Sequence, residues 1–105
     1  DDIKAMQEIR RVLKPQGFAI LQVPFFNPIP EVTQQDDSIT DPRMREKLFG
    51  QHDHVRKYGK DYAARIRQAG LRPVEDDFVN TLSDVERNHF GLVRGEIIYR
   101  AEKLL

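Results

Sequence analysis

The sequence predicts an α/β domain, and three neighbouring features near its N-terminus carry that prediction. Residues 2–13, capped by Asp1 or Asp2, place apolar side chains at helical spacing: Ile3, Met6, Ile9 and Leu13. Pro15 and Gly17 then occupy the second and fourth positions of a tight turn. Residues 18–23 form a nearly unbroken apolar run, which is typical of a strand buried on both faces in a helix-covered sheet.

Length and composition restrict the classes of protein that the chain can belong to. Its 105 residues amount to one domain or part of one. The 17 basic and 17 acidic residues cancel, which argues against a strong nonspecific attraction to nucleic acid or anionic lipid. No apolar run approaches the length of about 20 residues that spans a membrane. The absence of cysteine excludes disulfides and fits a cytoplasmic location.

Residues 24–50 follow the first strand and are predicted to form a substrate loop or lid. Three prolines within residues 24–30 exclude regular structure there, and residues 31–40 are polar and are predicted to be mobile. Ligands of open parallel sheets bind beyond the carboxyl ends of the strands. Phe25 and Phe26 leave such a strand end, so they either line a pocket or cap the core. A helix over residues 42–49, capped by Asp41, ends the loop at Gly50.

Side chains that could take part in catalysis or binding are most concentrated in residues 51–59. These residues contain His52, His54, Arg56 and Tyr58 within seven positions. A metal site could use both histidines, but two ligands are fewer than the three or four of a stable site, so no metal is assigned. Histidine titrates near neutral pH, so acid–base catalysis or substrate contact is a second reading. A structural connector with locally satisfied polar groups is the third, and all three remain open.

The C-terminal part is predicted to alternate between helices and strands. A helix over residues 60–69 has Tyr62, Ile66 and Ala69 as its apolar face. A strand over residues 71–79 contains Pro73, which places it at a sheet edge because proline cannot donate to the ladder. The remaining elements are a helix of residues 84–90, opened by a capping box at Ser83 and Glu86, and a last strand over residues 96–102.

Three segments resemble class I S-adenosylmethionine-dependent methyltransferases. Residues 8–17 read E-I-R-R-V-L-K-P-Q-G and are similar to the family's junction E-[IL]-x-R-[VL]-L-K-P-G-G, which feeds its fifth strand. Residues 49–62 are similar to F-G-Q-x-D-H-V-R-x-Y-G-x-D-Y, near the family's substrate site. Residues 67–74 resemble the entry to the sixth strand. Gln16 replaces the family's first glycine, so we expect a type I turn there and no left-handed residue.

The resemblance implies the C-terminal portion of a Rossmann-like, seven-stranded sheet. Residues 1–105 would form a single partial domain with strands five, six and seven, the seventh lying antiparallel between the other two. The family's glycine-rich cofactor loop has no counterpart, because no two glycines here are separated by one residue. Cofactor-binding residues are therefore not assigned, and S-adenosylmethionine would bind the complete protein. The chain begins where a helix begins, which we expect of a cut inside a longer protein.

The resemblance makes His52, His54, Arg56 and Tyr58 candidate site residues, and the enzymatic hypothesis gives roles to them and to the two phenylalanines. His52 or His54 would be the catalytic base, Arg56 and Tyr58 would orient the substrate, and Phe25 and Phe26 would shield it from water. The first functional hypothesis is thus the substrate-side half of a methyltransferase acting on a small-molecule acceptor, inactive as an isolated chain. The alternative is a noncatalytic half-domain that self-associates through the open edge of strand 18–23, where a fourth strand is missing.

Overall fold

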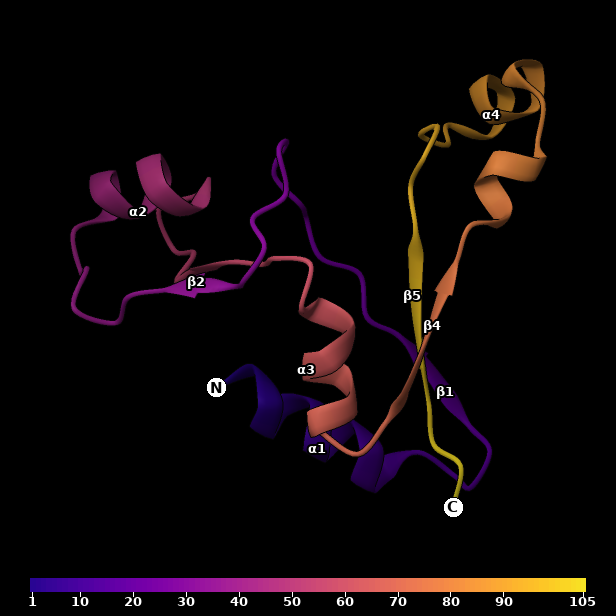
Figure 1. Cartoon of the computed structure of the whole chain (residues 1–105), viewed down its shortest axis with the longest axis horizontal. Coiled ribbons are helices and arrows are strands. Elements are labelled where there is room, and N and C mark those ends of the chain that lie inside the picture. The colour runs from indigo at the N-terminus through magenta and orange to yellow at the C-terminus, as the bar shows by residue number, and fades with distance from the viewer. The chain divides into compact units, whose positions relative to one another are not determined.

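The computed structural model describes residues 1–105 and divides into two compact units. The first unit comprises Asp1–Gln22 and Ala63–Leu105, and the second comprises Val23–Tyr62. The chain forms four α-helices, one 3-10 helix and short antiparallel strands, which Figure 1 shows as a mixed α/β architecture. The prediction that the chain belongs to the α/β class is confirmed. The chain's own sheets have three strands and two strands, so it does not itself form a seven-stranded sheet.

The sheet of the first unit has the strand order β1-β5-β4. Its strands are β1 (Phe18–Ile20), β4 (Arg72–Asp76) and β5 (Ile98–Glu102). The central strand β5 runs antiparallel to both neighbours, which is the placement that the resemblance implies for the seventh strand. Strand β4 lies at an edge, as Pro73 predicted.

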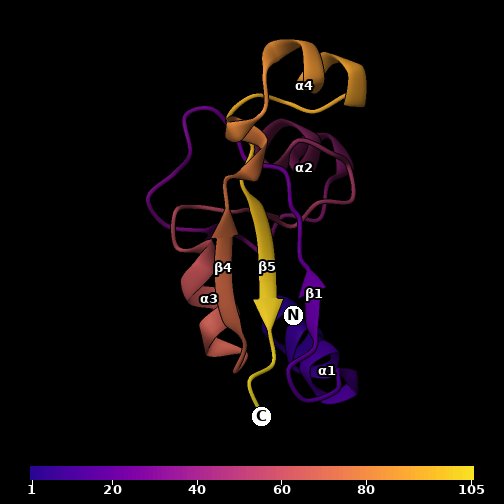
Figure 2. The same ribbon diagram turned by 90° about the vertical axis from the view of Figure 1, so that its right-hand side faces the viewer.

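Helices α1 (Asp2–Val12) and α3 (Tyr62–Gln68) lie on the same face of this sheet, as Figures 1 and 2 show. Asp1 caps α1 by accepting a hydrogen bond from the backbone of Lys4, so the predicted start of this helix is confirmed. The predicted apolar face of α3 is buried at all three positions. The buried apolar side chains of the first unit are Met6, Ala63, Ile66, Ala69, Leu71, Val79 and Ala101.

The prediction that residues 18–23 form a strand buried on both faces is wrong. Strand β1 ends at Ile20, and the side chains of Phe18 and Ile20 are 56% and 53% exposed. Helices cover only one face of the sheet, and the face turned to the viewer in Figure 2 carries none. Because side chains alternate along a strand, Phe18 and Ile20 lie on the face opposite to Ala19, whose cross-strand partner Ala101 is fully buried. The guanidinium of Arg100 lies 5.7 Å from the Phe18 ring centroid. An apolar run alone cannot indicate how many helices cover a sheet.

The turn before β1 also differs from the predicted type I turn. Gln16 adopts a positive φ of 64°, and Gly17 N–H donates to the carbonyl of Lys14 at 2.9 Å. A left-handed residue with a side chain costs about 1–2 kcal/mol. Tertiary pairing explains why the chain accepts this cost, because Gln16 N–H donates to the carbonyl of Lys103 at 2.7 Å. Lys103 N–H in turn donates to the carbonyl of Gly17 at 2.8 Å.

Strands β4 and β5 are joined by a helical arm, formed by the 3-10 helix Phe78–Thr81 and α4 (Asp84–Phe90) (Figure 1). The predicted capping box is confirmed, with Ser83 and Glu86 each accepting a hydrogen bond from the other's backbone N–H. Hydrogen bonds from the Ser83 backbone and hydroxyl hold the pKa of Glu86 below its usual range. The buried Arg87 donates to the carbonyls of Val79 and Leu82, which ties α4 to the preceding turn.

The second unit contains α2 (Pro42–Phe49) and a two-stranded sheet of β2 (Gln34–Gln35) and β3 (Arg56–Lys57). The predicted bounds of α2 are confirmed: the Asp41 carboxylate accepts from Arg43 N–H at 3.0 Å, and Gly50 ends the helix with a φ of 93°. Strand β2 lies inside residues 31–40, where the sequence predicts only a mobile polar loop. Two glutamines have no apolar alternation, so this strand depends on its pairing with β3.

Candidate functional site

The second unit holds a cavity of about 300 Å³, which is at the small end of the range for small-molecule sites. It is formed by residues 23–26, by the last residue of α2, and by residues 53–58, which include β3. Most of its wall is apolar: Val23, Pro24, Phe26, Phe49, Val55 and Tyr58. Its polar side chains are Asp53, His54 and Arg56. A neighbouring hollow of about 270 Å³ shares Phe26 and His54 with this cavity and adds Phe25 and Gln51.

The structure brings five of the six candidate residues together and leaves one outside. Phe26, His54, Arg56 and Tyr58 line the main cavity, and Phe25 lines the neighbouring hollow. The side chain of His52 is exposed and lines neither space. Of the two histidines proposed as the base, the geometry therefore favours His54.

Sequence reasoning missed several residues of the wall, of which Phe49 is the most buried. Its only sequence signal is an apolar side chain in the last turn of a predicted helix, and that signal cannot separate a pocket wall from ordinary core. Asp53 lies within residues 51–59, and the sequence gives it no separate role. It lines the cavity from an exposed position.

His54 is oriented by the end of α2. Its Nδ1 lies 3.1 Å from the carbonyl oxygen of Phe49, one of the carbonyls that the helix end leaves without an intrahelical partner. A carbonyl oxygen only accepts hydrogen bonds, so we assign the ring proton of the neutral imidazole to Nδ1. Nε2 then carries the lone pair, which is the form that a general base requires. The left-handed Gly50 permits this turn, and Phe26 packs closely against it.

Arg56 and Tyr58 contact each other, and each also contacts a further residue. Arg56 Nε donates to Gln35 Oε1 at 3.0 Å, and its guanidinium carbon lies 5.7 Å from the Tyr58 ring centroid. The Tyr58 ring meets Tyr62 edge-on, with centroids 4.7 Å apart. Phe25 packs on Tyr62 in the same way, at 5.7 Å. Such aromatic pairs add about 0.5–1.5 kcal/mol beyond their buried area, so the wall on this side is well anchored.

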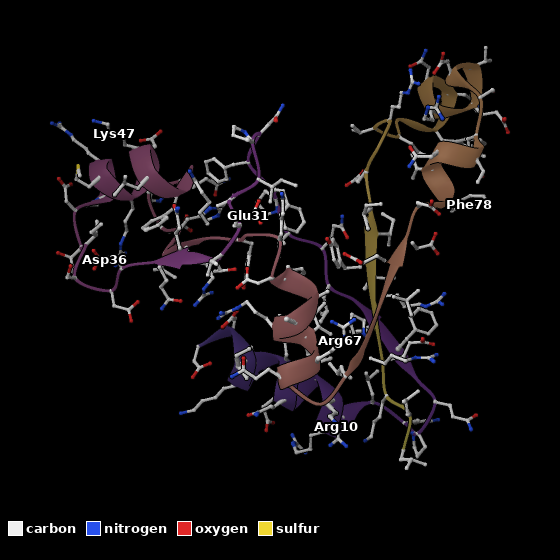
Figure 3. All side chains as sticks on the ribbon, viewed as in Figure 1. Arg10, Glu31, Asp36, Lys47, Arg67 and Phe78 are labelled. Atoms are coloured by element: carbon white, nitrogen blue, oxygen red, sulfur yellow. The ribbon has the colours of Figure 1, made fainter.

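Polar contacts also connect residues 31–33 of the second unit to residues 59–61. The Asp61 carboxylate accepts hydrogen bonds from the backbone N–H and the hydroxyl of Thr33, at 2.8 and 2.6 Å. Gly59 N–H donates to the Thr33 hydroxyl at 3.1 Å. Lys60 adds an ion pair with Glu31 at 2.6 Å (Figure 3 labels Glu31). These contacts join the segment just before β2 to the chain that follows β3.

The chemistry available at the cavity is that of a proton acceptor beside a cation in aromatic surroundings. No group of three or more histidine, cysteine, aspartate or glutamate side chains is arranged to hold a metal ion. None of the four helices is long and apolar enough to cross a membrane. Comparisons of the chain with protein-family models, with curated proteins and with solved structures gave no match.

Proposed function

We propose that this chain is the substrate-side half of an S-adenosylmethionine-dependent methyltransferase that acts on a small-molecule acceptor in the cytoplasm. One observation carries the proposal: residues 24–30, which leave the end of the first strand, and residues 49–62, which the resemblance places near the substrate, converge on a single cavity. The order β1-β5-β4, with β5 antiparallel to both neighbours, supports it independently. The isolated chain is expected to be inactive.

The residues present do not fit the cofactor. No two glycines are separated by one residue, so the chain has no glycine-rich turn of the kind that lets a backbone approach a nucleotide. S-adenosylmethionine, which supplies an electrophilic methyl group when bound, would therefore be held by other parts of the complete protein. The exposed open face of the sheet at Phe18 and Ile20 is compatible with further chain packing there.

The residues of the cavity have distinct tasks under this proposal. Nε2 of His54 accepts the proton that the acceptor's nucleophilic atom loses, with a contribution of about 10²–10⁴-fold to the rate. Arg56 and Tyr58 orient the acceptor, and positioning of this kind supplies much of the rate of a transfer reaction. Phe25 and Phe26 exclude water from the reacting atoms.

The natural polypeptide that contains this chain provides the test. We expect a G-x-G-x-G turn after a strand about 70–90 residues before Asp1, a spacing compatible with βαβ units of roughly 30 residues. Isothermal titration calorimetry should show that this polypeptide binds S-adenosylmethionine. His54→Phe should reduce methyl transfer by about 10²–10⁴-fold and leave cofactor affinity unchanged. His89→Phe, in α4, is the matched control and should retain activity. Failure of the natural polypeptide to bind the cofactor would refute the proposal.

A second candidate function is a noncatalytic half-domain that pairs with another copy of itself. The difference between the two edge strands of the sheet favours this function. Strand β1 exposes the apolar side chains of Phe18 and Ile20, whereas Pro73 in β4 opposes pairing with a further strand. Unprotected apolar edges are templates for strand addition.

Self-association of this kind predicts a dimer whose population rises with protein concentration in sedimentation velocity experiments. Ile20→Lys should shift the chain to monomer, since a charge at an edge opposes pairing. Val85→Lys, at an exposed position of the helical arm, should leave the dimer intact. A wild-type chain that stays monomeric up to millimolar concentration would exclude this candidate.

A further inference from the structure

The cavity of the second unit combines three features that together restrict its ligand. The space of about 300 Å³ corresponds to the volume of about ten water molecules, so a ligand the size of one substituted ring fits it. Phe26, Phe49 and Tyr58 contribute aromatic surface to the wall. Aromatic walls favour planar ligands, because rings stack or meet edge to face. A flexible aliphatic chain would use this surface poorly.

Arg56 supplies a positive charge that is available to a ligand. The residue is half-buried, and its Nε donates to the neutral side chain of Gln35. No carboxylate forms an ion pair with it, so its remaining N–H groups can donate to an anion. A planar guanidinium binds carboxylates through two parallel hydrogen bonds. Asp53 also lines the cavity, but it is exposed to solvent and its charge is better screened than that of Arg56.

His54 supplies a hydrogen-bond acceptor. Its Nδ1 is engaged by the Phe49 carbonyl at 3.1 Å, so the neutral ring presents an unprotonated Nε2. An unprotonated imidazole nitrogen pairs with a ligand group that donates a proton, such as a hydroxyl. A ligand that carried only an acceptor at this point would leave both groups without a partner.

We propose that the cavity binds a small aromatic hydroxy acid, with its carboxylate on Arg56 and its hydroxyl donating to Nε2 of His54. This assignment rests on the proposed function, since the hydroxyl oxygen would be the atom that accepts the methyl group. In the complete protein, the O–H proton would pass to Nε2 of His54 and the oxygen would form the new bond to the methyl carbon. The bond between that carbon and the sulfonium sulfur of S-adenosylmethionine would break, and its electron pair would leave with S-adenosylhomocysteine as a neutral thioether. Binding itself needs no cofactor, so it can be tested on the 105-residue chain.

The binding test uses 4-hydroxybenzoate as the probe and isothermal titration calorimetry as the measurement. Benzoate, which lacks the hydroxyl, should bind about threefold to tenfold more weakly, as expected for one neutral hydrogen bond. 4-Hydroxybenzyl alcohol, which lacks the carboxylate, should bind about tenfold to a hundredfold more weakly. These ligand comparisons use the wild-type chain and do not depend on whether a variant folds.

Two variants assign the contacts. Arg56→Gln should weaken 4-hydroxybenzoate binding by about tenfold to a hundredfold. Arg67→Gln, which removes an exposed arginine of α3 in the first unit, is the matched control and should leave binding unchanged (Figure 3 labels Arg67). His54→Phe should abolish the difference in affinity between 4-hydroxybenzoate and benzoate. Circular dichroism spectra should confirm that each variant keeps the wild-type fold.

The inference is overturned if 4-hydroxybenzoate shows no saturable binding, if Arg56→Gln behaves like Arg67→Gln, or if the hydroxyl preference survives in His54→Phe. Its failure is separable from that of the proposed function. Binding by the chain without methyl transfer by the natural polypeptide would retain the ligand class and remove the enzyme. Methyl transfer to acceptors that do not compete with 4-hydroxybenzoate would retain the enzyme and remove this ligand class.

Discussion

Replacing Gly59 with alanine is expected to lower the free energy of unfolding of the second unit by about 3 kcal/mol or more. A β-carbon at this position would lie 2.6 Å from the carbonyl carbon of Val32, 2.7 Å from the carbonyl oxygen of Pro30 and 2.8 Å from the backbone nitrogen of Thr33. All three atoms belong to the backbone, so no side-chain rotation relieves the contact. The segments joined by Thr33 and Asp61 would have to move apart. Urea denaturation monitored by tyrosine fluorescence measures the loss.

Gly91→Ala is the control for this experiment. A β-carbon there meets no heavy atom within 4 Å, but the backbone has a positive φ of 68°. The substitution should therefore cost only the conformational term, about 1–2 kcal/mol. Equal losses of stability for the two variants would contradict the proposed role of Gly59 as a site of close backbone approach. Gly59→Ala should also abolish 4-hydroxybenzoate binding, because Tyr58 precedes it directly and Arg56 lies three residues before it.

The second large effect is expected at the ion pair between Asp2 and Arg65, which joins α1 to α3. Arg65 donates through Nε and a terminal nitrogen to the two oxygens of Asp2, both at 2.8 Å. The Asp2 side chain is only 9% exposed. Arg65→Met would leave this carboxylate poorly solvated without its cation. Removing one partner of a buried pair costs about 3–5 kcal/mol, and we expect about 2–4 here because Arg65 is partly exposed.

Arg11→Met provides the comparison for the ion pair. Arg11 pairs with Glu8 at 2.9 Å, but both side chains are 68% exposed, so the loss should stay below about 1 kcal/mol. The double variant Asp2→Asn/Arg65→Met should recover part of the stability lost in Arg65→Met, because no unpaired charge is left. Thermal unfolding of the four chains measures these differences. A double variant less stable than Arg65→Met would show that the cost does not come from the unpaired carboxylate.

The candidate site was predictable from sequence in its composition and only partly in its geometry. Residues 51–59 stood out because two histidines, an arginine and a tyrosine occur there. Whether His52 or His54 faces the cavity depends on how the chain leaves α2 at Gly50, and that turn is closed by the carbonyl of Phe49. The wall residues Val23 and Phe49 have only the signal of an apolar side chain in a predicted strand or helix, which ordinary core residues share. They become pocket residues only when the proline-rich loop meets the end of α2.

The sequence by itself determined the elements whose signals lie within a few neighbouring residues. Asp41, Gly50 and the capping box of Ser83 and Glu86 set helix ends through local hydrogen bonds, and Pro73 placed its strand at an edge. Tertiary structure alone decided the exposure of Phe18 and Ile20, the left-handed conformation of Gln16 and the pairing of β2 with β3. Those features depend on contacts with distant segments. The free energy gained from burying a side chain or pairing a strand depends on which distant segment packs against it, and local sequence does not specify that segment.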